Sequence, residues 1–152
     1  MVGRFDIVYS AGVAEHFSPT EDCIAAFSKF LAPGGLLLTL VPNMTGTVGW
    51  VQRKLDRDVF DIHVPLSKDA LRQAHCRAGL TVEWSDYFLS AGFGIVNTSA
   101  LDPAKASTKV KKAIAKGLGS LSTATWLLED ISVRLPQTQA FSQFVVCAAR
   151  RP

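Results

Sequence analysis

Residues 5–17, FDIVYSAGVAEHF, predict a buried strand that runs directly into a polar loop. Phe5–Ser10 is rich in β-branched and aromatic residues and is almost continuously apolar after Asp6. That pattern is typical of a strand in a parallel sheet, with helices covering both faces. The loop ends in Glu15 and His16, two side chains that can move a proton or contact a substrate. The stretch therefore predicts one strand of an α/β sheet with a candidate site at its end.

A helix is predicted immediately after this loop. Ser18 can cap the free backbone N–H groups, Pro19 suits the first turn, and Glu21 completes a capping box. Pro33-Gly34-Gly35 then ends the helix and turns the chain. The residues expected to face the core recur at helical spacing: Ile24, Phe27, Phe30 and Leu31.

Leu36–Val41 predicts a second buried strand, which Pro42 and Asn43 close. Two such strands joined through a helix by short connections favour a right-handed βαβ unit. We therefore expect an α/β fold with a parallel sheet.

Further elements are predicted from residue 44 onward. A short helix spans about Val48–Leu55, and a charged loop leads from it to His63. A longer helix opens at Ser67 and ends at Gly79. Residues 80–90 alternate in polarity as a strand does. Three of its apolar residues are expected to share one face: Leu80, Val82 and Trp84.

Residues 102–136 predict a helical insertion before the last strand, Phe141–Ala149. Its first helix is rich in lysine and breaks near Gly117 and Gly119, and a second helix follows. The lysines could meet an anionic lipid surface or an acidic substrate, but the aromatic anchors of membrane-lying helices are missing. A solvated face on a helix packed over the sheet is therefore favoured. The five lysines are Lys105, Lys109, Lys111, Lys112 and Lys116.

The composition fits one globular domain. The chain has 152 residues, 48% of them hydrophobic and 19% charged, which suffices for a core without a disulfide or metal. A formal charge of +3 is too small to indicate a nucleic-acid partner. No apolar run approaches the ~20 residues of a membrane span. Three cysteines without metal-type spacing, in apolar segments, favour a reduced, cytoplasmic protein: Cys23, Cys76 and Cys147.

Four motifs together resemble the C-terminal half of class I methyltransferases, which use S-adenosylmethionine (SAM). They are Phe5-Asp6-Ile7-Val8, Glu15-His16-Phe17, Leu31-Ala32-Pro33-Gly34-Gly35 and Val41-Pro42-Asn43. Each motif is weak alone, but their order and spacing extend over about residues 5–90. The resemblance implies a partial Rossmann-like methyltransferase sheet of about four strands with flanking helices, as a single domain over residues 1–152.

The same resemblance implies a cofactor site at the end of the first strand. Ser10, Ala11, Gly12 and Val13 would run along the methionine part of SAM, and Gly12 would let the backbone come close. Asn43 would face the same crevice, and His63 would close over the substrate. The acceptor implied is an oxygen or nitrogen of a small molecule.

Glu15 and His16 are the candidate catalytic residues, because an acceptor that loses a proton needs a base. A structural role for His16 remains as well supported, and an exposed loop is the favoured interpretation of His63. His75, within a helix, is expected to be structural. Relatives in the ubiquinone-pathway and small-RNA O-methyltransferases hold a divalent metal through an E-x-x-E-H pattern. Gly12 stands at the first acidic position here, so no metal is predicted.

The glycine-rich loop and the acidic strand end with which this family holds SAM have no counterpart in residues 1–152. Phe5–Ser10, an interior strand in the family, would therefore form an exposed apolar edge. We expect a second copy, a separate N-terminal polypeptide or a rearranged local segment to cover it, and a truncated product is equally compatible. Three functions follow: a SAM-dependent methyltransferase, a methyltransferase-like subunit or scaffold that binds no SAM, or a basic peripheral membrane module that uses the helical insertion.

Overall fold

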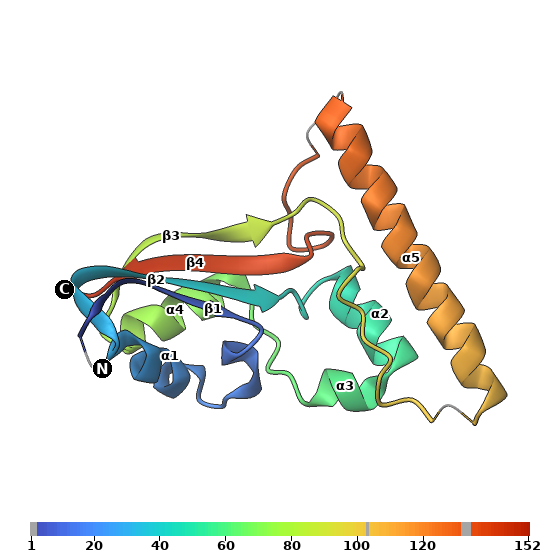
Figure 1. Ribbon diagram of the computed structural model, residues 1–152, viewed down its shortest axis with the longest axis horizontal. Helices are drawn as coiled ribbons and strands as arrows, with labels where there is room; N and C mark the ends of the chain where they lie inside the picture. Colours follow the sequence, from blue (N-terminus) through green and yellow to red (C-terminus); the bar gives the residue numbers. More distant parts are fainter. Residues whose placement is uncertain (1–2, 103, 132–134) are drawn as a thin grey trace.

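A computed structural model describes residues 3–102, 104–131 and 135–152 of the chain and confirms the α/β fold. The described residues form a mixed sheet in the order β1-β2-β4-β3 (Figure 1). The strands are β1 (Phe5–Ala11), β2 (Leu31–Pro42), β3 (Thr81–Phe88) and β4 (Phe144–Arg150). β1 and β2 are parallel, as predicted, whereas β4 runs antiparallel to both of its neighbours.

Two helices, α1 (Thr20–Ser28) and α4 (Lys68–Arg77), cover one face of this sheet (Figure 1). The hydrophobic core lies between them and the strands, and Ile24 of α1 and Leu71 of α4 are fully buried in it. Beyond the carboxyl ends of β1 and β2 lie a 3-10 turn, η1 (Ala14–His16), and two short helices, α2 (Thr47–Leu55) and α3 (Arg57–Asp61). This arrangement leaves the loops after β1 and β2 side by side.

The start and end of α1 differ from the sequence prediction. Pro19 occupies the N-cap position and no side chain caps the helix, so the expected Ser18 capping box is wrong. Thr20 Oγ1 instead donates to the Phe17 carbonyl at 3.0 Å. The helix ends at Ser28, and Leu31 begins β2, where it is fully buried. By contrast, Ser67 does cap α4, accepting from the Ala70 N–H at 3.2 Å.

Three other local predictions also need correction. The charged stretch before His63 contains α3, which Asp56 caps by accepting from the Val59 N–H at 3.3 Å. In β3, a register shift between Val82 and Trp84 breaks the alternation of sides. Val82 packs against the core while Trp84 is exposed, so the two do not share a face. Of the cysteines, Cys23 and Cys147 are buried as expected, but Cys76 is exposed.

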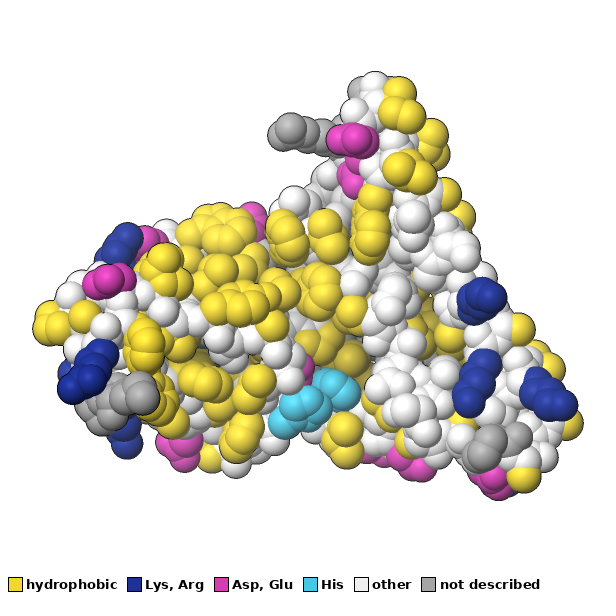
Figure 2. Space-filling model, viewed as in Figure 1, with side chains coloured by type: hydrophobic (Ala, Val, Ile, Leu, Met, Phe, Trp, Pro, Cys, Tyr) yellow, Lys and Arg dark blue, Asp and Glu magenta, His cyan; other side chains and the backbone are white. Residues whose placement is uncertain are grey.

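The second face of the sheet carries large apolar side chains that the described residues leave uncovered. Figure 2 shows hydrophobic side chains gathered over the strands. Ile7 and Tyr9 of β1 are 65% and 58% exposed, so the prediction that β1 is covered on both faces is wrong. An apolar hollow of about 240 Å³ opens there, lined by Tyr9, Leu38, Leu40, Trp84, Phe88 and Val146. In the described sheet β1 is also an edge strand, as expected.

The helical insertion is one continuous helix, α5 (Ala106–Ile131), rather than two. Gly117 and Gly119 lie inside it, at a cost of about 1 kcal/mol each relative to alanine. α5 does not lie over the sheet; it extends past the ends of the strands (Figure 1). Its contacts are with the segment after β3: Trp126 Nε1 donates to the Ala91 carbonyl at 2.6 Å, and Ser122 Oγ accepts from the Phe93 N–H at 2.7 Å. None of the helices in the described ranges is long and apolar enough to cross a membrane.

Candidate functional site

Two adjoining clefts lie beyond the carboxyl ends of β1 and β2, where open α/β sheets bind their ligands. The inner cleft, of about 360 Å³, is lined by Ala11, Gly12, Glu15, Leu40, Pro42, Met44, Gln52, Val59, His63, Ile95, Asn97 and Phe144. The outer cleft, of about 450 Å³, is lined by His16, Asp58, Val59, Ile62, His63, Asn97, Ser99 and Ala100. His63 is shared between them, which makes this region the candidate site.

Gly12 directly follows the end of β1 and has a conformation that favours glycine. Its φ is +67°, and its N–H donates to the Leu40 carbonyl at 2.9 Å. A Cβ placed there would meet Glu15 Oε1 as its nearest atom, at 3.6 Å, so there is space above the backbone. Of the four residues predicted to contact SAM, Ala11 and Gly12 line the inner cleft, whereas Ser10 is buried and Val13 half-buried outside its lining.

Glu15 is a buried carboxyl group at the wall of the inner cleft. Glu15 is the middle residue of η1 and is 1% exposed, and its Oε1 is the nearest atom to a Cβ placed on Gly12. Burial raises the pKa of Glu15, although a backbone hydrogen bond and neighbouring His16 act in the opposite direction. Oε2 has no hydrogen-bond partner among the described residues. Keeping such a carboxyl group charged in the folded state is costly. Carboxyl groups with a shifted pKa are common at functional sites.

His16 and His63 meet although 46 residues separate them in the chain. Their ring centroids lie 4.6 Å apart at a 46° tilt. Nδ1 of His16 lies 3.1 Å from the Ile62 carbonyl and Nδ1 of His63 lies 2.6 Å from the Val59 carbonyl, so each Nδ1 donates. Burial lowers the pKa of His63, with a smaller contribution from His16. Both Nε2 atoms are therefore left as acceptors at the outer cleft.

Glu15, His16 and His63 together form a cluster that could hold a metal ion, since one ligand atom from each lies within 4.8 Å of the others. Two imidazoles and a carboxylate suit divalent transition metals, and metal-bound histidines commonly donate their other N–H to a carbonyl. The prediction of no metal counted only Glu15 and His16, because Gly12 replaces the first acidic residue of the motif. Sequence reasoning did not identify His63 as a third ligand, since only the fold brings it to the other two.

Asn43, the other predicted substrate residue, does not reach either cleft. It is fully buried, and its Nδ2 donates to the carbonyls of Gln139 at 2.7 Å and Ser142 at 2.9 Å. Its Oδ1 accepts from Thr45 Oγ1 at 2.8 Å. These bonds hold the turn before β4, so the geometry offers no support for a contact between Asn43 and a substrate.

His75 lies in the core, consistent with a structural role. Its Nδ1 donates to the Leu71 carbonyl at 2.8 Å, and its Nε2 lies 2.9 Å from Thr39 Oγ1 on β2. Burial lowers its pKa, which favours the neutral ring that accepts from the Thr39 hydroxyl.

Gln52 is a site residue that sequence reasoning missed. It is 1% exposed, and its amide makes a two-way bond to Asn97: Nε2 donates to the Asn97 carbonyl at 2.7 Å, and Oε1 accepts from the Asn97 N–H at 2.8 Å. The pair holds the segment around Ile95 over the inner cleft. Helical periodicity can indicate that Gln52 faces inward, but nothing in the pattern points to a partner 45 residues away.

Glu15→Gln is expected to raise the thermal midpoint of the chain at pH 8. Because the folded-state pKa of Glu15 is raised above 4.5, the ionised form is disfavoured in the folded chain only. The buried Glu15 carboxylate therefore destabilises the fold at pH values above the raised pKa, and this destabilisation disappears below the pKa of the unfolded chain. The increase in thermal midpoint given by Glu15→Gln should accordingly shrink as pH falls towards 4.5. Calorimetric scans across this pH range measure it.

Glu21→Gln is the matched control. The pKa of Glu21 is lowered, first by a backbone hydrogen bond and then by Arg77, which donates to it at 2.9 Å. The same substitution should therefore give no gain there. A midpoint that falls at pH 8 in Glu15→Gln, or a gain that persists at pH 4, would contradict the assignment of Glu15 as a destabilising buried carboxylate.

The fold of this chain is that of class I SAM-dependent methyltransferases. A possible histamine N-methyltransferase from Thermotoga maritima superposes with a TM-score of 0.58 at 14% identity, over 99% of this chain and 58% of that one. A SAM-dependent methyltransferase from Archaeoglobus fulgidus gives 0.54 at 14% identity, over 99% and 61%. A putative methyltransferase from Haloferax volcanii, in complex with the activator Trm112, gives 0.53 at 16% identity, over 99% and 56%.

The chain thus spans between 56% and 61% of the length of these three structures. No family model and no curated protein matches it. The likeness confirms the predicted fold class, a partial Rossmann-like methyltransferase sheet with a helix inserted before the last strand.

Proposed function

We propose that this chain is the substrate-side half of a SAM-dependent methyltransferase that modifies an oxygen or nitrogen of a small molecule. The observation that carries the proposal is the Glu15–His16–His63 cluster, set beside the strand end formed by Ala11 and Gly12. A strand end with room above a glycine suits the close approach of a cofactor, and the adjoining histidines suit an acceptor that must lose a proton.

The chain's own residues would position the acceptor and take its proton. SAM would supply a methyl group on a sulfonium, already a strong electrophile, at the inner cleft. His16 Nε2 can take the proton that the methylated substrate loses, because Nδ1 donates its hydrogen to the Ile62 carbonyl. Glu15, 4.0 Å from His16 Nε2, would stabilise the imidazolium that forms. The Gln52–Asn97 pair would hold the covering segment and limit water.

Residues 1–152 lack the glycine-rich loop by which this fold holds the rest of SAM. We propose that a polypeptide segment outside residues 1–152 completes the site and covers Phe5–Ser10; a separate N-terminal half and a second copy are two candidates. The bare apolar face beside this edge supports such a cover, because exposed apolar strands are prone to pair. One structural neighbour is itself bound to an activator protein. We further propose a cytoplasmic location and no nucleic-acid substrate.

Titration of the purified chain with SAM in a calorimeter, with its mass measured in parallel, tests the proposal. We expect saturable binding that weakens at least about tenfold in Gly12→Ala. Gly34→Ala is the matched control, because Gly34 also has a positive φ, +75°, with nothing within 4 Å of a Cβ, but lies at the other end of β2. It should leave affinity unchanged. Alanine is preferred to valine because a β-branched residue at a positive φ would strain the backbone itself.

The second candidate function is a methyltransferase-like subunit or scaffold that binds no SAM. The uncovered apolar face of the sheet favours it, because that surface suits a permanent partner. Absence of SAM binding, both alone and with any polypeptide that covers Phe5–Ser10, would support this role and overturn the catalytic one.

A further inference from the structure

The outward side of α5 carries a regular apolar stripe. Its positions alternate in steps of four and three, the spacing of a coiled-coil seam. They are Val110, Ile114, Gly117, Leu121, Ala124, Leu128 and Ile131. All seven are exposed, and the five large side chains are between 47% and 81% exposed. Residues on the other side of the helix, such as Ser122 and Trp126, make the contacts with the rest of the chain.

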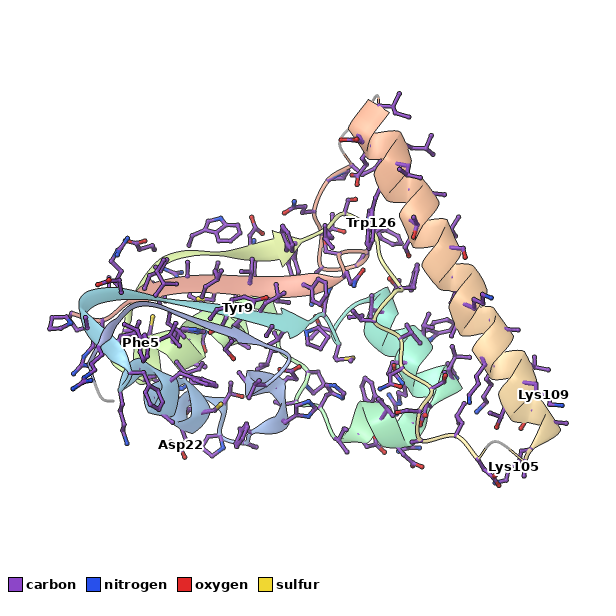
Figure 3. All side chains as sticks on the ribbon, viewed as in Figure 1. Phe5, Tyr9, Asp22, Lys105, Lys109 and Trp126 are labelled. Carbon is purple, nitrogen blue, oxygen red and sulfur yellow. The ribbon has the colours of Figure 1, made fainter. Side chains whose placement is uncertain are left out.

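Charge along α5 is distributed against the helix dipole. Four lysines occupy its first half, whereas both of its acidic residues, Glu129 and Asp130, lie in its last turn. A helix N-terminus is partly positive and a C-terminus partly negative, so this arrangement destabilises an isolated helix. Figure 2 shows Lys and Arg side chains along one half of α5 and acidic side chains near its other end. Figure 3 shows Lys109 at the first end and Trp126 facing the segment after β3.

We propose that two copies of this chain associate through α5, with the two helices antiparallel and their apolar stripes in contact. Antiparallel pairing places the lysine-rich half of each helix beside the acidic end of the other and opposes their dipoles. In the single helix the lysines lie near the partly positive N-terminus and the acidic residues near the partly negative C-terminus. Antiparallel pairing relieves both of these repulsions. Parallel pairing would set lysines against lysines. With 26 residues, α5 is ~39 Å long, which allows several seam layers in the contact.

One antiparallel register fits both side-chain size and charge. When Ile114 of one copy faces Ile131 of the other, Leu121 faces Ala124, so large and small side chains alternate across the seam. The same register brings Lys116 of one copy within one residue of the level of Asp130 of the other, and Asp130 is exposed. This association leaves the Phe5–Ser10 edge free and goes beyond the proposed methyl transfer.

An anionic membrane is the other surface that a lysine-bearing amphipathic helix can bind, but the structure favours a second copy. The lysines occupy only half of α5, and Glu129 and Asp130 would be repelled by anionic headgroups. The exposed stripe also contains no aromatic residue to anchor at the lipid interface.

The test is the mass of the full chain in solution by sedimentation equilibrium, with 16.4 kDa as the mass of one copy. We expect a dimer that dissociates in Leu121→Glu, with a dissociation constant raised by at least about tenfold, because a charge enters the seam. Thr123→Glu is the matched control; it adds the same charge at an exposed position of α5 outside the stripe and should leave the dimer intact. Circular dichroism of each variant establishes that α5 is still formed.

A charge exchange tests the direction of pairing. Lys116→Glu should weaken the dimer, and adding Asp130→Lys in the same chain should restore part of the affinity. A dimer unaffected by Leu121→Glu would place the contact elsewhere, for example on the open face of the sheet, and would overturn the proposal. A monomer at all concentrations would also overturn it, as would a monomer that binds phosphatidylserine vesicles through Leu121.

Discussion

His16→Ala is expected to lower the rate of methyl transfer by about 10²–10⁴-fold, the usual contribution of a general base. Its effect on stability should be small, because the His16 side chain is partly exposed and, among the residues that the structure describes, hydrogen-bonds to the Ile62 carbonyl alone. The measurement is the rate constant of methyl transfer in single-turnover assays of the completed enzyme, together with the thermal midpoint. Added imidazole should restore part of the rate if the missing group is a proton acceptor.

His75→Ala is the matched control for this prediction. His75 bonds to Leu71 and Thr39 inside the core, so its loss should lower the thermal midpoint clearly and leave turnover of the folded fraction nearly unchanged. If His16→Ala behaves like His75→Ala, His16 is structural. If chelation abolishes activity, a divalent ion restores it, and His63→Ala removes that restoration, the Glu15–His16–His63 cluster is a metal site rather than a base.

Gly49→Ala should destabilise the fold by about 3 kcal/mol or more, at or above the usual range for an overpacked site. A Cβ on Gly49 would stand 2.0 Å from the Met44 carbonyl oxygen and 2.5 Å from its carbon. These are backbone atoms that cannot swing away, so α2 or the loop after β2 must move. Since α2 carries Gln52, the segment held through Asn97 should also loosen over the inner cleft.

Thermal denaturation of Gly49→Ala and Gly94→Ala measures this effect. Gly94 has no heavy atom within 4 Å of a Cβ and lacks a positive φ, so alanine should be tolerated there. Equal midpoints for the two variants would show that α2 does not pack against Met44 as the structure has it.

The local sequence pattern was enough to predict the βαβ unit of the sheet and the residue that caps α4. The apolar runs of Phe5–Ser10 and Leu36–Val41 indicate strands because side-chain type and backbone preference act over a few residues. Ser67 begins α4 for the same reason, since a cap needs only the N–H groups three residues ahead. Glu15 and His16 could be singled out because they are adjacent and follow a strand end.

The contacts between distant residues were decided only by the tertiary structure. His63 joins Glu15 and His16, and Gln52 bonds to Asn97, because α2 and α3 fold back against the carboxyl ends of β1 and β2. Asn43 follows a strand end as the site residues do, yet its amide is used by the turn before β4.

The sequence pattern of a single strand likewise could not show which face of the sheet is covered by other elements. An apolar strand such as β1 indicates that its side chains should be buried, but it cannot specify what buries them. Ile7 and Tyr9 therefore remain exposed in this chain although their sequence is that of an interior strand. The sequence by itself determined the four strands, the helices α1, α2 and α4, their order along the chain and the Glu15–His16 pair. The tertiary structure decided which side chains meet, because burial and contact depend on how the elements pack.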